Sequence, residues 1–196
     1  DLFYYKPRLD LDRLAEYANG NMIAFSGHLG SDLANVIFAD PKSAYNSRTE
    51  EEAKRFTHPD WAENVVTMAN QYIDIFGKEN FFVEIQAIDQ ENSPAASLVA
   101  KGLRYVAKKY GYRTVATADS HYPEKKDAED QLLLLCSSMR TTLRNVRKKL
   151  KETGDASFSG FIRSNNFHIP SLEEIQAVNT PQEIEMSMQI ASMCED

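Results

Sequence analysis

The sequence is poor in cysteine and contains no long apolar run. Only Cys136 and Cys194 occur among 196 residues, far apart and without a CxxC spacing. A disulfide framework and a zinc ribbon are therefore both disfavoured, and we expect a reducing, cytoplasmic setting. No stretch approaches the roughly 18 continuous apolar residues of a membrane span, and no basic-then-apolar leader is present. We therefore expect no membrane partner.

Positive charge is also scarce. The chain has 22 Lys and Arg residues against 29 Asp and Glu residues, which gives a net charge of -7. Such a balance disfavours a surface that wraps nucleic acid through phosphate neutralisation alone, so DNA contacts must be local or supplied by other domains. The one dense positive cluster lies in residues 140–151. It is open to two interpretations, a local phosphate-binding patch or a solvated helix face.

The chain has enough apolar residues to bury a core, with 42% hydrophobic and 10% aromatic residues. It opens on Asp1 and then an apolar, aromatic run over residues 2–5, as if it were entered partway through a folded unit. We interpret the chain as a fragment of a longer protein or a processed product.

The hydrophobic pattern alternates between helices and short buried strands. Helices are predicted over residues 11–18, from residue 60 to Gly77, and from residue 93 to Gly111; strands are predicted over residues 22–25, 81–86 and 114–118. This rhythm is typical of parallel βαβ units, which defines an α/β fold class. Functional residues of such folds usually follow the carboxyl ends of the strands. The positions to inspect are therefore His28, the residues after Gln86, and residues 119–121.

The last third of the chain is predicted to be helical. One helix is expected over residues 127–138, and two capping boxes open two more. These boxes pair Ser171 with Glu174 and Thr180 with Glu183. The last helix is expected to pack through Ile184, Met188 and Ala191.

The strongest local motif is Asp119-Ser120-His121, placed where a strand runs into a loop. The carboxylate and the imidazole are metal ligands, and a metal held there would activate water for phosphoester hydrolysis. The alternative is a capping aspartate beside a surface histidine, which is the more frequent meaning of this motif by itself.

His28 follows a separate buried strand, so it is a candidate third ligand if the strand ends converge. The alternative is a hydrogen-bonded histidine in a tight turn that Gly27 and Gly30 allow. Glu84 and Gln86 share one face of their strand and point either to the site or to solvent.

Other polar candidates are interpreted as structural. Asp10 and Asp12 imitate a carboxylate pair but stand at the start of the first helix, where acidic residues cap and favour the helix dipole. His58 and His168 have no neighbouring ligand pattern and are assigned structural roles.

The order of these motifs resembles the PHP (polymerase and histidinol phosphatase) domain of the alpha subunit of bacterial-type DNA polymerase III, over nearly the whole chain. The resemblance is carried by several short blocks in the same order. They are Tyr4-Tyr5-Lys6-Pro7-Arg8, Ile23-Ala24-Phe25-Ser26-Gly27-His28-Leu29, Phe82-Val83-Glu84-Ile85-Gln86, Ala116-Thr117-Ala118-Asp119-Ser120-His121-Tyr122, Phe167-His168-Ile169 and Ile190-Ala191-Ser192-Met193-Cys194.

The resemblance implies part of a distorted (β/α)₇ barrel with parallel strands, over residues 1–160, followed by C-terminal helices over residues 161–196 that lead toward a polymerase core. It implies that Asp119 and His121 are the last metal ligands and have catalytic roles. It places His28, as a further ligand, where the polymerase family commonly has a cysteine. The implied cofactor is a divalent metal: zinc, manganese or magnesium.

The chain departs from the family pattern in two respects. The family's first ligands, including an HxH motif, have no counterpart, so the metal site within this chain is incomplete and the remaining ligands must come from residues before Asp1. After Gln86, the chain has Ala87-Ile88 where some relatives carry an Asp-His pair. Residues 40–58 and 140–158 are longer or more charged than expected, which suits a divergent, viral version.

The resemblance implies a parent nucleotidyltransferase that carries out DNA-directed DNA synthesis in replication. The family's polymerising carboxylates lie far downstream, so this chain alone cannot polymerise DNA. Its expected role is either metal-dependent 3′-to-5′ exonuclease or phosphoesterase activity, or docking of a separate proofreading exonuclease, with DNA and a sliding clamp as partners of the parent. The alternatives are a free-standing phosphoesterase of the histidinol phosphatase type and a metal-free interaction scaffold.

Overall fold

The fold is organised around a three-stranded parallel sheet. The computed structural model describes residues 3–4, 6–7, 9–86, 92–154 and 158–194. Its strands β3 (Ala24–Phe25), β4 (Phe81–Ile85) and β5 (Thr114–Ala116) lie in the order β3-β4-β5. Since both pairings are parallel, the carboxyl ends of the three strands share one edge of the sheet.

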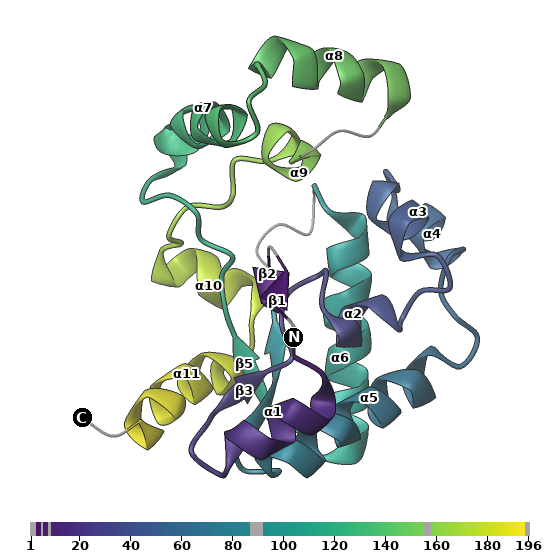
Figure 1. Cartoon of the computed structure of the whole chain (residues 1–196), viewed down its shortest axis with the longest axis vertical. Coiled ribbons are helices and arrows are strands. Elements are labelled where there is room, and N and C mark those ends of the chain that lie inside the picture. Colours follow the sequence, from purple (N-terminus) through teal and green to yellow (C-terminus); the bar gives the residue numbers. More distant parts are fainter. Residues whose placement is uncertain (1–2, 5, 8, 87–91, 155–157, 195–196) are drawn as a thin grey trace.

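Helices connect and cover these strands. The helix α6 (Pro94–Tyr110) joins β4 to β5 and packs against β4, as does α5 (Trp61–Phe76). The helix α11 (Pro181–Met193) packs against β5 (Figure 1). Because β4 is covered in this way, its sequence is an almost unbroken apolar run, as expected for a buried parallel strand.

The remaining elements are short. In chain order they are β1 (Phe3–Tyr4), β2 (Lys6–Pro7), α1 (Leu11–Ala18), α2 (Asp32–Asn35), α3 (Pro41–Asn46), α4 (Glu50–Lys54), η1 (Lys125–Asp127), α7 (Ala128–Ser138), α8 (Leu143–Thr153), α9 (Ser159–Arg163) and α10 (Leu172–Val178). Helices α7, α8 and α9 lie together at one end of the molecule, apart from the sheet (Figure 1).

The hydrophobic core divides according to the two faces of the sheet. Phe81, Val83 and Ile85 belong to the main cluster, which α2 to α6 build with the sheet. Phe82 points to the opposite face and joins a smaller cluster that includes Ile190 of α11. This alternation follows from the two-residue period of a strand, and it places Glu84 on the same face as Phe82.

The structure confirms most of the predicted elements. α1 spans the predicted residues 11–18, α5 and α6 end at the predicted glycine stops, and Gly111 adopts φ +71°, a conformation that favours glycine. Asp10 caps α1 by accepting a hydrogen bond from the backbone N–H of Arg13. Both predicted capping boxes are present. The α/β class is confirmed, and within the described residues the sheet has three parallel strands rather than a closed seven-stranded barrel.

Two sequence interpretations need correction. Residues 41–46 form α3, although no helix is predicted there from the sequence. The packing face of α11 was also predicted wrongly, because Met188 is 72% exposed whereas Glu183 and Ile190 are buried. The apolar pattern of this helix is misleading because a buried ion pair sets its rotation.

That ion pair joins Arg104 of α6 to Glu183 of α11. The guanidinium Nε donates to Glu183 Oε1 and Nη2 donates to Oε2, both at 2.8 Å. Nη2 also donates to the carbonyl of Val178, and Glu183 accepts from the backbone N–H of Thr180 at 2.9 Å. Glu183 is 3% exposed, so a carboxylate without Arg104 would be buried and uncompensated.

Arg104→Ala is expected to lower the free energy of unfolding by about 3–5 kcal/mol, because it removes one partner of a buried, hydrogen-bonded pair. Urea denaturation measures the change. Lys101→Ala is the matched control: it breaks the ion pair of Lys101 with Glu50, whose side chains are 59% and 36% exposed, and should cost at most about 1 kcal/mol. If the two substitutions lowered the free energy of unfolding equally, the Arg104–Glu183 pair would not be the stronger, buried interaction.

Glu183 also predicts a pH dependence. Burial raises the pKa of its carboxyl, but hydrogen bonds from Arg104 and Thr180 outweigh burial and lower the pKa from its ordinary value of 4.5. The stabilisation is therefore fully present above pH 4.5 and is lost as the pH falls through the lower folded-state pKa. The difference in unfolding free energy between the protein and Glu183→Gln should shrink on acidification below pH 4.5. A difference independent of pH would refute this.

Candidate functional site

The three strand ends meet at one cavity. His28 follows β3, Gln86 follows β4 and Asp119 follows β5, and all three line a cavity of about 510 Å³. The parallel register produces this convergence, because Phe25 pairs with Phe82 and Ile85 pairs with Ala116. The sequence predicts functional residues at the carboxyl ends of the strands, and this edge of the sheet borders the cavity.

His28 is held in a tight turn. Gly27 has φ +84°, and a side chain there would meet Cβ of Ser31, the N-cap of α2, at 2.9 Å. The imidazole Nδ1 accepts a hydrogen bond from the backbone N–H of Gly30 at 2.7 Å. A neutral His28 in this arrangement therefore carries its proton on Nε2 and is a hydrogen-bond donor through that atom.

Asp119 and His121 form a carboxylate–imidazole pair. His121 Nε2 lies 3.0 Å from Asp119 Oδ1, and the two side chains are 37% and 47% exposed. This separation is that of a hydrogen bond from the imidazole N–H to the carboxylate oxygen. A metal bound by both side chains would displace the proton between them.

A backbone clamp positions this pair. His121 N donates to Phe167 O at 2.7 Å and Ile169 N donates to Tyr122 O at 3.1 Å, in a short parallel bridge. Ser120 Oγ adds a hydrogen bond to the carbonyl of His168 at 3.1 Å. The Asp119–His121 loop is thus fixed by the segment that precedes α10.

His168 is part of the segment that holds the Asp119–His121 loop, and its side chain is itself held by Glu174. It is buried, and its Nε2 lies 3.2 Å from Glu174, the third residue of α10. The backbone N–H of Ser171 is the largest cause that lowers the pKa of Glu174, followed by His168. The structural role predicted for His168 agrees with this arrangement. His58 also has a local partner, since its Nδ1 accepts from the backbone N–H of Asp60 at 3.0 Å.

Glu84 is bonded to two residues that line the cavity, Gln86 and Thr117. Its Oε1 accepts hydrogen bonds from Thr117 Oγ1 at 2.5 Å and from Gln86 Nε2 at 3.0 Å. Ser26 Oγ accepts from the backbone N–H of Glu84 at 2.9 Å. Glu84 lies on the central strand of the sheet, Gln86 follows that strand, and both are half-buried. They therefore do not face solvent on an edge strand, which was one of the two alternatives. The contribution of Thr117 was not evident from the sequence.

The far wall of the cavity comes from α3 and α9. Tyr45 is half-buried, and its hydroxyl lies within hydrogen-bonding distance of Leu29 O at 2.6 Å and Asn35 Oδ1 at 2.5 Å. Burial raises the pKa of Tyr45 to about 12. Lys42 and Arg163 bring positive charge to the same cavity. Sequence reasoning missed these residues, because α3 was not predicted and Arg163 has no motif around it.

The described residues do not complete a metal site. No group of three or more His, Cys, Asp or Glu side chains among them is arranged to hold a metal ion. Asp119 and His121 are two ligand-type side chains held next to each other, but His121 Nε2 is engaged by Asp119 and His28 Nδ1 is engaged by Gly30. The metal roles of His28, Asp119 and His121 therefore stay predictions.

Comparison with known proteins defines the class of protein first: residues 1–88 match the PHP domain family. The particular relatives are subunits of a DNA polymerase. The chain is 29% identical over 198 residues to DNA polymerase III subunit alpha of Thermus aquaticus, which covers 98% of this chain and 13% of that protein. It is 33% identical over 155 residues to the subunit of Saccharopolyspora erythraea, with 79% and 11% covered.

The subunit of Deinococcus radiodurans is 30% identical over 178 residues, which covers 89% of this chain and 10% of that protein. These comparisons confirm the resemblance to the PHP part of polymerase III alpha subunits that the motif order predicts. The chain spans between 10% and 13% of the length of these three relatives. Within the described residues, no helix is long and apolar enough to span a membrane.

The turn at His28 predicts its tautomer. A long-range ¹H–¹⁵N correlation spectrum should show neutral His28 protonated at Nε2. Gly30→Ala should disturb this state, because the new Cβ would lie 2.7 Å from His28 Cε1. Gly160→Ala is the control in the same cavity, since no atom lies within 4 Å of its Cβ position. A His28 spectrum unchanged by Gly30→Ala would contradict the observed turn.

Proposed function

We propose that this chain is the PHP part of a replicative DNA polymerase alpha subunit and that its cavity binds the phosphodiester at a DNA 3′ end for metal-assisted hydrolysis. The observation that carries the proposal is the convergence of His28 and Asp119 on one cavity, with His121 paired to Asp119. We also propose that the parent polymerase carries out DNA synthesis with a sliding clamp as partner. Within this chain, we propose a barrel part over residues 1–160 and a helical part over residues 161–196.

The charge of the cavity supports an anionic substrate. Lys42 and Arg163 line it, and among the described lining residues Asp119 is the only acidic one. This local positive excess is opposite in sign to the net charge of -7 of the whole chain. Arginine and lysine bind phosphate oxygens through charge-assisted hydrogen bonds, so a phosphodiester suits this cavity better than a neutral ligand does.

The chain's own residues have distinct roles in this proposal. Asp119 and His121 hold the metal, together with ligands that this chain does not supply. A bound metal contributes Lewis acidity and a water molecule of lowered pKa. His28 donates from Nε2 to a phosphoryl oxygen, because its Nδ1 is engaged by Gly30. Arg163 neutralises a second oxygen.

A scaffold that docks a separate exonuclease is the second candidate. One observation favours it: among the described residues no third ligand accompanies Asp119 and His121, and these two are hydrogen-bonded to each other. In this version the pair stabilises the loop instead of binding a metal. No feature of the described residues specifically favours a free-standing phosphoesterase, and the relatives compared above are polymerase subunits.

The double substitution Asp119→Asn, His121→Asn separates the two candidates. In the full-length polypeptide it should weaken Mn²⁺ or Zn²⁺ binding, measured by calorimetry, by about 100-fold, because losing ligands costs at least as much as losing outer-shell partners. Release of nucleotides from a 3′-labelled single strand should fall in parallel. Asp130→Asn, an exposed carboxylate of α7, is the control.

Three outcomes are distinguishable. Loss of metal binding and of hydrolysis in the double variant alone supports the hydrolytic site. Hydrolysis retained by the double variant rejects the catalytic roles of Asp119 and His121. Absence of metal binding in the unsubstituted protein, together with easier unfolding of the double variant than of Asp130→Asn, supports the scaffold in place of hydrolysis.

A further inference from the structure

We propose that Phe161 and Phe167 form an aromatic wall that stacks one unpaired nucleobase, so that the cavity selects a single-stranded terminal nucleotide over a paired one. The inference deepens the proposed function, on which it rests for the use of the same cavity. It adds a base-binding subsite to the phosphate-binding and metal-binding roles.

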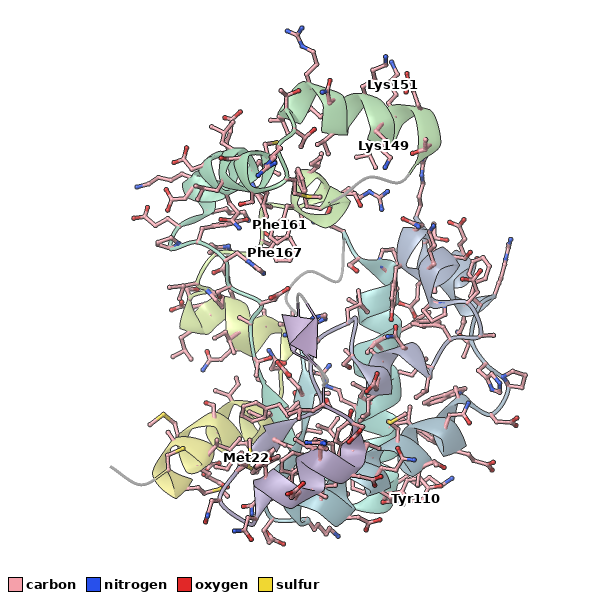
Figure 2. All side chains as sticks on the ribbon, viewed as in Figure 1. Met22, Tyr110, Lys149, Lys151, Phe161 and Phe167 are labelled. Atoms are coloured by element: carbon pink, nitrogen blue, oxygen red, sulfur yellow. The ribbon has the colours of Figure 1, made fainter. Side chains whose placement is uncertain are left out.

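The two rings are neighbours on the cavity surface. Their centroids are 4.5 Å apart with planes inclined by 40°, and both residues line the cavity. Figure 2 shows them side by side below α9. His121 meets both rings edge-on, at centroid distances of 4.8 Å from Phe161 and 5.9 Å from Phe167. The aromatic wall therefore adjoins the Asp119–His121 pair directly.

Other side chains pack α9 against its neighbouring helices. Phe158 and Ile162 pack α9 onto the buried cluster of Cys136 and Val146, from α7 and α8. Phe161 belongs to none of the hydrophobic clusters of the described residues, and the same holds for Phe167. Both rings are partly buried and line the cavity. Aromatic rings that line a concave site are characteristic of ligand-binding surfaces.

The polar lining complements a nucleotide. Arg163 follows Phe161 by two residues, and its Nη2 donates to Gly154 O at 2.9 Å. A guanidinium has five N–H donors, so this bond leaves donors for a phosphate. Lys42 adds a second positive charge from the α3 wall. An aromatic surface beside a cation is the combination that proteins use to bind single strands.

The cavity is large enough for a nucleotide. Its volume of about 510 Å³ lies within the range of about 300–1,000 Å³ for small-molecule sites. A base within a duplex has both faces covered by neighbouring bases, so it reaches the rings only after it is unstacked at a cost of a few kcal/mol. An unpaired terminal base avoids most of this cost.

Binding of short oligonucleotides by the 196-residue chain, in EDTA to prevent hydrolysis, tests the proposal. By calorimetry, (dT)₄ should bind about 10-fold more tightly than a tetramer whose 3′-terminal nucleotide is abasic, and a blunt duplex should gain no such preference. The double substitution Phe161→Leu, Phe167→Leu should remove the preference, because leucine keeps apolar volume without a ring. Arg163→Gln should weaken both tetramers equally.

Tyr105→Leu is the matched control, since it removes an exposed aromatic ring that lines a different cavity. Saturation transfer from the thymine protons to the rings of Phe161 and Phe167 in the unsubstituted protein provides a readout that does not depend on variant folding. Equal binding of the normal and abasic tetramers, or absence of transfer to these rings, overturns the aromatic wall. Base-dependent binding without hydrolysis in the full-length protein rejects only the hydrolytic function.

Discussion

The parallel alignment of β3, β4 and β5 is the constraint on which the candidate site depends. Parallel hydrogen bonding brings the carboxyl ends of all three strands to one edge, although the strands are far apart in the sequence. His28, Gln86 and Asp119 therefore line the same cavity. An antiparallel or slipped pairing would send one of these side chains to another edge or face.

The C-terminal helical region completes the site. The bridge between Tyr122 and His168 fixes the Asp119–His121 loop, and the segment around α9 supplies Phe161, Phe167 and Arg163 to the cavity. The Arg104–Glu183 ion pair joins α11 to α6, the helix that leads into β5. The charge and the aromatic surface of the cavity thus come largely from outside the residues that match the PHP family, 1–88.

Strongly periodic or capped segments were predictable. α5, α6 and the two capping-box helices follow from spacing and local hydrogen bonds, and the motif at residues 116–122 indicates the correct strand end. The rotation of α11 was not predictable, because Glu183 is buried only in the presence of Arg104. The bond from Thr117 to Glu84 was also unavailable to sequence reasoning, since Thr117 follows a different strand.

The sequence by itself determined the α/β class, the family resemblance and the three ligand-type residues at strand ends, because strand period, glycine stops and caps act over a few neighbouring residues. Only the tertiary structure decided what those residues contact: His28 with Gly30, and His121 with Asp119 and Phe161. The physical reason is that a side chain's partners depend on packing between distant segments, which no local pattern encodes.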